Sequence, residues 1–214
     1  MQIEYLAHSC FLLTSKSGFR VMIDPYGPEI GYGKIQRHAD LILVTHSHPD
    51  HDNINGVPGA ARVFASAGEK DFDGVKVSAM ISMHGGNPED KFNLVFSISM
   101  DGIKLAHLGD LGEIPSVSLL DFLEGTQVLM IPAGGHFTID AAQAKKIVEM
   151  LKPSIVIPMH FRTASIDRVR VPLAPVEDFS SLFANTKILR ESVLEIKAGD
   201  LPEKTGIVVM NHTY

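Results

Sequence analysis

The segment THSHPDH, residues 45–51, places three histidines and an aspartate directly after the apolar run LILV. Imidazole and carboxylate ligands without a thiolate suit Zn²⁺, Mn²⁺ or Fe²⁺. Because alternate residues at the end of a strand point the same way, His46 and His48 can bind one ion. Asp50 and His51 follow where the chain turns, and they can reach a second ion. The segment therefore predicts a metal centre.

Further candidate ligands stand where other apolar runs end. His84 follows VKVSAMISM, Asp110 ends IKLAHLGD, and His160 ends SIVIPMH. Taken singly, such a residue is more often a capping or turn residue than a ligand. Their recurrence at strand ends favours a shared site, since rigid elements position a site better than loops do.

Two divalent ions about 3.5–4 Å apart lower the pKa of a shared water towards ~7, which makes hydroxide available at neutral pH. One ion also stabilises the negative charge that develops on a carbonyl or phosphoryl oxygen. The sequence contains neither a G-x-S-x-G nucleophile segment nor a phosphate-binding glycine loop. We therefore predict a metal-dependent hydrolase whose metal-bridged hydroxide attacks an ester, lactone, amide or phosphoester of a small molecule. Asp50 can also orient this hydroxide.

Other histidines and carboxylates receive smaller roles. His8 and Asp24 end early strands, and we expect them to orient ligand imidazoles or to make hydrogen bonds in the core. His136 lies between a strand and a helix, where it either contacts substrate or serves the turn. His107, inside an apolar strand, is expected to be a buried histidine with satisfied hydrogen bonds.

A basic segment follows His160. Its residues Arg162, Arg168 and Arg170 either bind an anionic group of the substrate or form a solvated loop. The second interpretation is the commoner one for such a segment.

The elements that must position these residues are strands in the first half and alternating strands and helices in the second. Two apolar runs, 3–15 and 19–25, surround a glycine-containing turn and predict a hairpin. Further strands are predicted over 40–46, 61–66, 75–80, 93–100, 103–110, 127–132, 154–160, 192–197 and 206–210. Helices are predicted over 115–125, 138–153 and 174–185. This order favours an α/β (α+β) fold of two sheets with helices packed outside.

Composition indicates one globular domain over residues 1–214, with 45% hydrophobic and 21% charged residues. The single cysteine, Cys10, excludes an internal disulfide and a thiolate metal cluster. A net charge of −6 does not attract nucleic acid or an anionic membrane. No apolar run approaches the ~20 residues of a membrane span, and the N-terminus lacks a basic leader segment, so we expect a cytoplasmic protein. A homo-oligomer is compatible with the sequence.

Several segments together resemble the metallo-β-lactamase superfamily. THSHPDH, MHGG at 83–86, HLGDLG at 107–112 and IPMHF at 157–161 occur in the order seen there. AHSCF (7–11), IDP (23–25) and PAGGHFT (132–138) are similar to the branch of metal-dependent hydrolases that includes ascorbate-6-phosphate lactonase. The resemblance covers residues 2 to about 162. It implies a four-layer αβ/βα sandwich of two mixed sheets, with helices on the outer faces and metals at one edge.

The resemblance also implies a ligand set of seven residues. His46, His48 and His84 would hold the first ion. Asp50, His51 and His160 would hold the second, and Asp110 would bridge the two. Asp50 and Asp110 are then the predicted catalytic carboxylates, and Zn²⁺ is favoured over Mn²⁺ or Fe²⁺. The chain departs from the branch at LGE (111–113), where Thr-Gly is usual, and at TASIDRVRVPLAP (163–175).

Two alternative functions remain at this point. A nuclease or phosphodiesterase of the same superfamily would carry a basic groove and an added nucleic-acid-binding insertion, against which the net charge and the length argue. A non-hydrolytic metal protein, for redox chemistry or sensing, is the other. Di-iron relatives usually have Glu in place of the second histidine, which here is His48.

Overall fold

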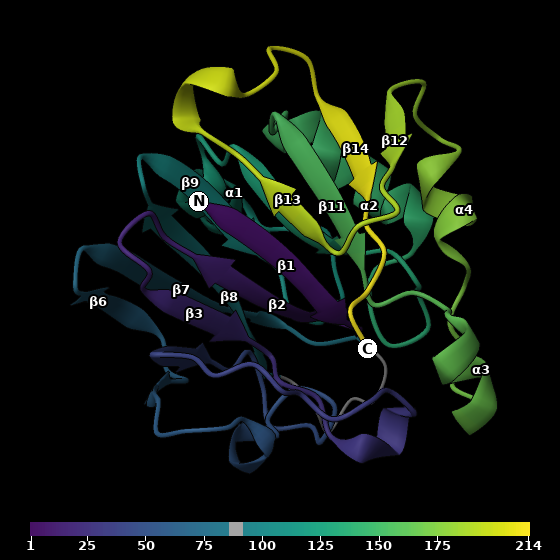
Figure 1. The fold of residues 1–214 in the computed structure, drawn as a ribbon. Helices are drawn as coiled ribbons and strands as arrows, with labels where there is room; N and C mark the ends of the chain where they lie inside the picture. The colour runs from purple at the N-terminus through teal and green to yellow at the C-terminus, as the bar shows by residue number, and fades with distance from the viewer. Residues whose placement is uncertain (86–91) are drawn as a thin grey trace.

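Two mixed β-sheets pack face to face in the computed structural model, which describes residues 1–85 and 92–214 (Figure 1). The first sheet has the strand order β13-β1-β2-β3-β4-β5. Its strands are β1 (Gln2–Ala7), β2 (Cys10–Thr14), β3 (Arg20–Ile23), β4 (Leu41–Leu43), β5 (Arg62–Phe64) and β13 (Val193–Glu195). The pairs from β13 to β3 are antiparallel, whereas β3, β4 and β5 run parallel.

The second sheet has the order β12-β14-β11-β10-β9-β8-β7-β6. Its strands are β6 (Gly68–Phe72), β7 (Val75–Met83), β8 (Phe92–Met100), β9 (Ile103–His107), β10 (Val128–Pro132), β11 (Ile155–Met159), β12 (Thr186–Ile188) and β14 (Gly206–Val209). The strands from β12 to β9 are parallel, and those from β9 to β6 are antiparallel.

The main hydrophobic core lies between the two sheets, and it follows from the two-residue period of the strands. Ile3 and Tyr5 of β1 and Val77 of β7 point into it and are almost completely buried. Burying one such side chain contributes about 1.5–3 kcal/mol. Packing between the two inner faces fixes the position of one sheet against the other, and so places the strand ends that carry the candidate site.

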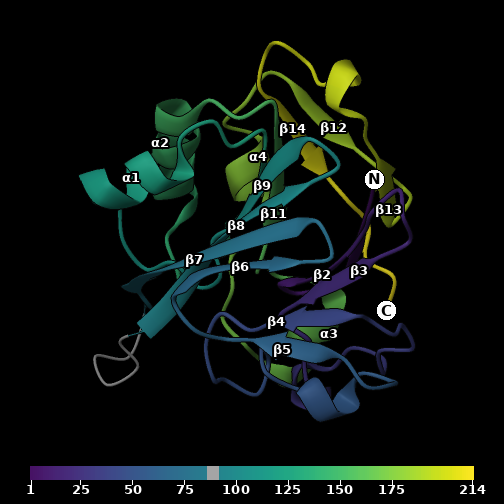
Figure 2. The ribbon, with the colours of Figure 1, turned by 90° about the vertical axis from the view of Figure 1, so that its left-hand side faces the viewer.

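Helices cover the outer faces of both sheets, as the predicted fold class requires (Figure 2). The second sheet is covered by α1 (Val117–Leu123), α2 (Ala141–Leu151) and α4 (Val176–Ser180). A capping box of Asp140 and Gln143 starts α2, and its buried Ala144, Ile147 and Val148 recur at helical spacing. The first sheet has a thinner cover, which consists of α3 (Ala164–Val169), the 3₁₀ turns η1 (Pro28–Ile30) and η2 (Ile54–Gly56), and loops. A third 3₁₀ turn, η3, spans Ala198–Asp200.

The structure corrects one prediction from sequence and adds an element that the sequence analysis did not predict. The apolar run 3–15, expected to be one strand, forms two antiparallel strands, because His8 has a positive φ of 56° and turns the chain between β1 and β2. The segment 163–175, which matched nothing known, contains the short helix α3, capped by the Thr163 side chain. No helix among the described residues is long and apolar enough to cross a membrane.

Candidate metal centre

The His-x-His-x-Asp-His segment leaves the first sheet just after β4 and turns sharply. The backbone N–H of His51 donates to the carbonyl of His48 (2.8 Å), and Pro49 lies within this turn. The turn brings Asp50 and His51 back beside His46 instead of continuing the strand. The segment therefore presents its side chains to two neighbouring positions.

The first position is surrounded by His46, His48 and His84. Their ring centroids lie 4.6, 4.7 and 4.8 Å apart, and one nitrogen from each lies within 4.8 Å of the others. His84 comes from the end of β7 in the second sheet and is paired by a β-bridge with Leu111. Residues predicted to bind the first ion are therefore brought together from both sheets.

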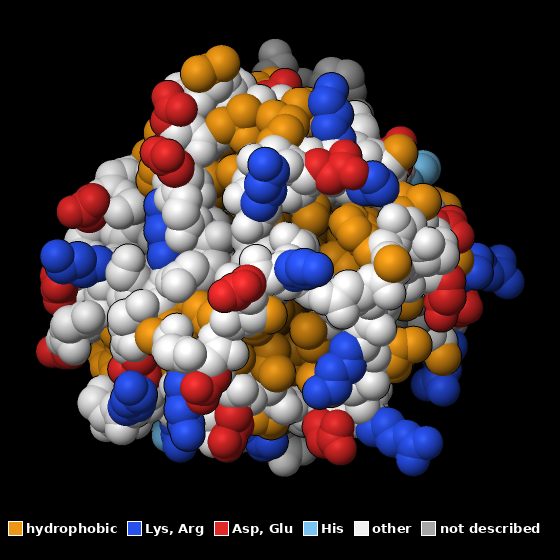
Figure 3. All heavy atoms as spheres, turned by 90° about the horizontal axis from the view of Figure 1, so that it is seen from above, with side chains coloured by type: hydrophobic (Ala, Val, Ile, Leu, Met, Phe, Trp, Pro, Cys, Tyr) orange, Lys and Arg blue, Asp and Glu red, His pale blue; other side chains and the backbone are white. Residues whose placement is uncertain are grey.

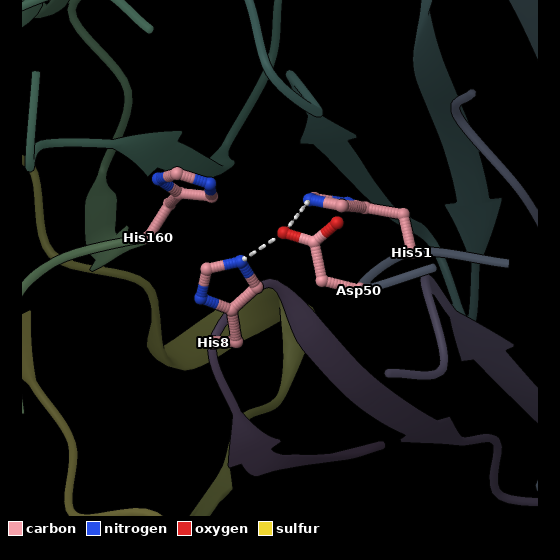
Figure 4. A group of neighbouring side chains, drawn as sticks. All are labelled: His8, Asp50, His51 and His160. Carbon is pink, nitrogen blue, oxygen red and sulfur yellow. Dashed lines mark hydrogen bonds and ion pairs between the residues drawn. The ribbon is translucent and has the colours of Figure 1, made fainter. Parts of the chain in front are cut away.

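The second position is surrounded by Asp50, His51, His160 and, in addition, His8 (Figure 4). Ligand atoms of these four residues lie within 4.8 Å of one another. His51 Nε2 is 3.6 Å from Asp50 Oδ2, and His8 donates from Nε2 to the same oxygen at 3.1 Å. His8 was expected to orient a ligand imidazole or to make hydrogen bonds in the core, and its hydrogen bond goes to the carboxylate of Asp50.

Asp110 lies between the two positions, where β9 ends. Its Oδ2 is 3.5 Å from His84 Nε2 and 4.0 Å from His46 Nε2, both at the first position. The same carboxylate lies 3.1 Å from His160 Nε2 and, through Oδ1, 3.4 Å from His51 Nε2. All seven residues predicted as ligands thus converge on one place, with Asp110 at its middle.

These separations fit divalent ions. Nitrogen and oxygen ligands of one tetrahedral ion, at about 2.0–2.2 Å from it, lie roughly 3.3–3.6 Å apart. Among the described residues, the buried Nε2 atoms of His46, His51 and His84 and the Oδ1 atom of Asp110 have no hydrogen-bond partner. Buried polar atoms without partners are costly, so their gathering in one place fits a site that binds a cation.

The tautomers of three imidazoles point to the same conclusion. His51 donates from Nδ1 to Asp24 (2.9 Å), and the Nδ1 of His84 donates to the carbonyl of Gly85. The Thr45 hydroxyl donates to Asp24 and accepts from His46 Nδ1 at 2.9 Å. Each ring therefore uses Nδ1 toward a protein acceptor and leaves Nε2 as the nitrogen that faces the candidate metal positions.

The charges around His51 also favour a cation. Burial alone lowers the pKa of this imidazole, but Asp110, Asp50 and Asp24 raise it to about 10. Burial likewise opposes ionisation of Asp110, yet His160 and His51 hold the pKa of its carboxyl well below the ordinary value. Burial and the neighbouring His51 lower the pKa of His46 to about 3, so that ring is neutral. Asp50 and Asp110 thus face the Nε2 side of His51, Asp24 lies on its Nδ1 side, and together they stabilise positive charge there.

Two residues that the sequence did not single out hold the ligands in place. Thr45 binds both oxygens of the fully buried Asp24, through its backbone N–H (2.8 Å) and its hydroxyl (2.7 Å). Asn93 accepts from the backbone N–H of Asp110 (2.9 Å) and donates to the carbonyl of Leu108 (2.8 Å). In the sequence, only its position next to the predicted ligand His46 pointed to Thr45. No sequence feature pointed to Asn93.

Two other histidines from the sequence analysis are not members of these ligand groups. His136 is exposed, has a φ of 64° and packs against Phe137. His107 is fully buried, with Nε2 donating to the carbonyl of Ser9 and Nδ1 accepting from Gly109, which confirms the prediction for it.

The three arginines of the basic segment that follows His160 lie on or beside α3, and all three are exposed. Arg162 stands 3.9 Å from Asp167, measured from Nε to Oδ1. Arg168 lies in the last turn of α3, and Arg170 is its C-cap.

Comparison with known proteins agrees with this geometry. Residues 2–160 match the family model described as the beta-lactamase superfamily domain. A UPF0173 metal-dependent hydrolase of Thermococcus onnurineus is 28% identical, over 95% of this chain and 99% of its own length. A Thermotoga maritima protein, assigned to the Zn-dependent hydrolases of the metallo-β-lactamase superfamily, is 31% identical with a TM-score of 0.80, over 98% of this chain and 97% of its own. The metallo hydrolase Igni18 of Ignicoccus hospitalis shares the fold at 22% identity, with a TM-score of 0.66 over 85% of this chain and 89% of its own. The chain therefore belongs to the metallo-β-lactamase superfamily.

Proposed function

We propose that this protein is a metal-dependent hydrolase with two divalent ions, acting on an ester, lactone, amide or phosphoester of a small molecule. The observation that supports it most is the convergence of five imidazoles and two carboxylates on one place, where the buried Nε2 atoms of His46, His51 and His84 have no hydrogen-bond partner. Membership of the superfamily, and relatives named metal-dependent hydrolases, support the same assignment. Within the superfamily, AHSCF and PAGGHFT lead us to place the chain nearest the branch that includes ascorbate-6-phosphate lactonase.

The residues divide between the ions as follows. His46, His48 and His84 would hold the first, and Asp50, His51 and His160 the second. Asp110 would contribute to both. Divalent ions bound there activate water and act as Lewis acids toward the carbonyl or phosphoryl oxygen of the substrate. Zn²⁺ is favoured by the histidine-rich set, and Mn²⁺ and Fe²⁺ are compatible with it.

Asp50 is the carboxylate best placed to handle the attacking water. Its side chain is 28% exposed, whereas that of Asp110 is 3% exposed. Its contacts with His8 and His51 both use Oδ2, so Oδ1 can orient the water and accept its proton. In the overall reaction, the bond from the acyl or phosphoryl group to its leaving atom breaks. Water supplies a hydroxyl to that group and a proton to the leaving atom.

The test begins with elemental analysis of the purified protein. It is followed by a screen of esters, lactones, amides and phosphoesters, with Zn²⁺ or Mn²⁺ added. We expect two divalent ions per chain and hydrolysis of at least one class, abolished by a chelator and restored by metal. His38→Gln serves as a control, because His38 is exposed and lies outside the cluster. A protein that binds no metal, or that hydrolyses nothing in the screen with both ions bound, contradicts the proposal.

A further inference from the structure

Three large apolar side chains are exposed at the end of the second sheet that carries His84. Ile81 is 54% exposed, Met83 is 41% exposed and Phe92 is 70% exposed. We call these three residues the apolar strip. Exposed apolar side chains scattered singly are ordinary, but a contiguous group is typical of a binding surface.

The strip is contiguous because its members share one face of the β7–β8 pair. Met83 is directly opposite Phe92, and Ile81 is directly opposite Leu94. Alternate residues of a strand face the same side, so Ile81 and Met83 continue the face that buries Val77. That face is the inner one, since Val77 lies in the core between the sheets.

The inner face loses its cover before β7 ends. Gly68, the first residue of β6, pairs with Ala79, so β7 runs on beyond its neighbour at Ile81 and Met83. Figure 2 shows this end of β7 reaching past β4 and β5 of the first sheet. The strip is therefore a stretch of inner face without the opposing sheet.

The strip adjoins the candidate metal centre through its backbone. Met83 directly precedes His84, and its carbonyl accepts from Gly112, two residues after Asp110 (2.8 Å). Leu94, two residues from Phe92, donates from its backbone to the carbonyl of Thr45 (2.9 Å), next to His46. The inner face also faces the first sheet, from which the 45–51 segment leaves. The backbone at and next to the strip is thus hydrogen-bonded to the segments that carry His46 and Asp110.

We propose that the apolar strip binds an alkyl or aryl substituent of the substrate while the metal centre holds its polar head. This proposal rests on the proposed hydrolase function and adds a substrate class to it. Three side chains offer a few hundred Å², well below the roughly 800 Å² per partner of a standard protein interface. Because Met83 of the strip directly precedes the candidate ligand His84, the occupant that fits is the apolar part of a molecule held at the metal centre.

Straight-chain alkylphosphonates test the proposal without requiring turnover. Their anionic head binds the metal-loaded protein, and their chain probes the strip. For the wild type we expect octylphosphonate to bind at least ~10-fold tighter than ethylphosphonate, since each added methylene is worth up to ~0.8 kcal/mol when fully buried. In Phe92→Ser, and separately in Ile81→Ser, this gain should fall to ~3-fold or less, with ethylphosphonate affinity unchanged. Titration calorimetry gives these affinities, and KM along an alkyl series of any hydrolysed substrate gives a second measure.

Ile188→Ser is the matched control, because Ile188 is 75% exposed and lies on β12, at the opposite edge of the sheet from β6. It should keep the full chain-length gain. A larger apolar hollow of about 780 Å³, lined in part by Ile155, Leu201 and Val208, could also take an alkyl chain (Figure 3). It lies where β11 begins, whereas His160 follows the end of β11, so binding there would not depend on metal.

The outcomes separate the two proposals. Absence of both phosphonate binding and hydrolysis would defeat the proposed function. Hydrolysis or ethylphosphonate binding without any effect of chain length would defeat the strip proposal alone. A chain-length gain that survives in both serine variants would defeat it too, as would a wild-type dimer that Phe92→Ser dissociates in sedimentation experiments.

Discussion

Single residues at the metal centre are held by partners that fix their orientation. Asp24 fixes the ring of His51, Thr45 fixes both Asp24 and His46, and Asn93 fixes the backbone at Asp110. His8 plays the corresponding part for Asp50, through the hydrogen bond from its Nε2. Such partners orient a ligand and set which nitrogen carries its proton. The sequence analysis expected this role for His8 and Asp24, and Asp24 accepts a hydrogen bond from Nδ1 of the candidate ligand His51.

Replacing Asp24 by Asn should weaken the second ion while leaving the fold in place. The amide keeps the shape of the carboxylate but removes the charge that His51 faces and one acceptor for its Nδ1–H. We expect metal affinity at that position to fall by ~10–100-fold. Competition against a chromogenic chelator measures it. Asp40→Asn, at an exposed carboxylate, is the control, and equal affinities in the two variants would show that Asp24 has no such part.

Replacing Asp110 by Ala should have a larger effect, because this carboxylate is within 4.0 Å of imidazoles from both positions. We expect the variant to lose at least one ion per chain and most of its activity. Elemental analysis and the best substrate of the screen provide the measurements. Retention of two ions would contradict the bridging assignment.

At the scale of elements, the sequence predicted which strand ends carry ligands but not how the strands pair. Apolar runs ending at His84, Asp110 and His160 were legible because a polar group stops each run. The role of Asn93 was not, because it depends on β8 lying beside the 108–110 segment, a register that only the folded sheets fix. The turn at His8 was also missed, since the run 3–15 stays apolar on both sides of it. Local sequence patterns did not reveal the apolar strip either, because its exposure depends on how the folded sheets lie against each other.

Substitution of Gly109 tests how closely the segment before Asp110 must approach Asn93 and Thr45. It has a φ of +54°, and a Cβ there would collide with Asn93 Oδ1 and lie 2.8 Å from Thr45 Cβ. Gly109→Ala should therefore cost about 3 kcal/mol, from overpacking and from the left-handed backbone together. Urea unfolding gives the free energy.

Gly125→Ala separates the two causes. Its φ is +74° with nothing within 4 Å of the added Cβ, so it should cost only about 1–2 kcal/mol. Equal losses in the two variants would mean that the contact with Asn93 and Thr45 imposes no constraint on this loop.

Across the whole molecule, the candidate ligands join the two sheets. His46, His48, Asp50 and His51 follow β4 of the first sheet. His84, Asp110 and His160 follow β7, β9 and β11 of the second. Under the proposed function, ions bound by both groups would cross-link the sheets at one edge of the sandwich, where the carboxylates otherwise repel one another. Metal binding is thereby coupled to the stability of the fold.

Removal of metal should therefore lower the melting temperature of the whole protein. An ion present at 100 times its Kd stabilises the folded state by about 2.7 kcal/mol. For a chain of this size, 1 kcal/mol corresponds to roughly 2–4 °C, so we expect a loss of roughly 5–10 °C or more with a chelator. Calorimetry on metal-loaded and chelated protein measures it. The Asp110→Ala variant already lacks the carboxylate that lies between the two ion positions. The chelator should therefore lower the melting temperature of this variant by less than that of the wild type. If the chelator shifts wild type and variant equally, or shifts neither, the ions do not hold the two sheets together.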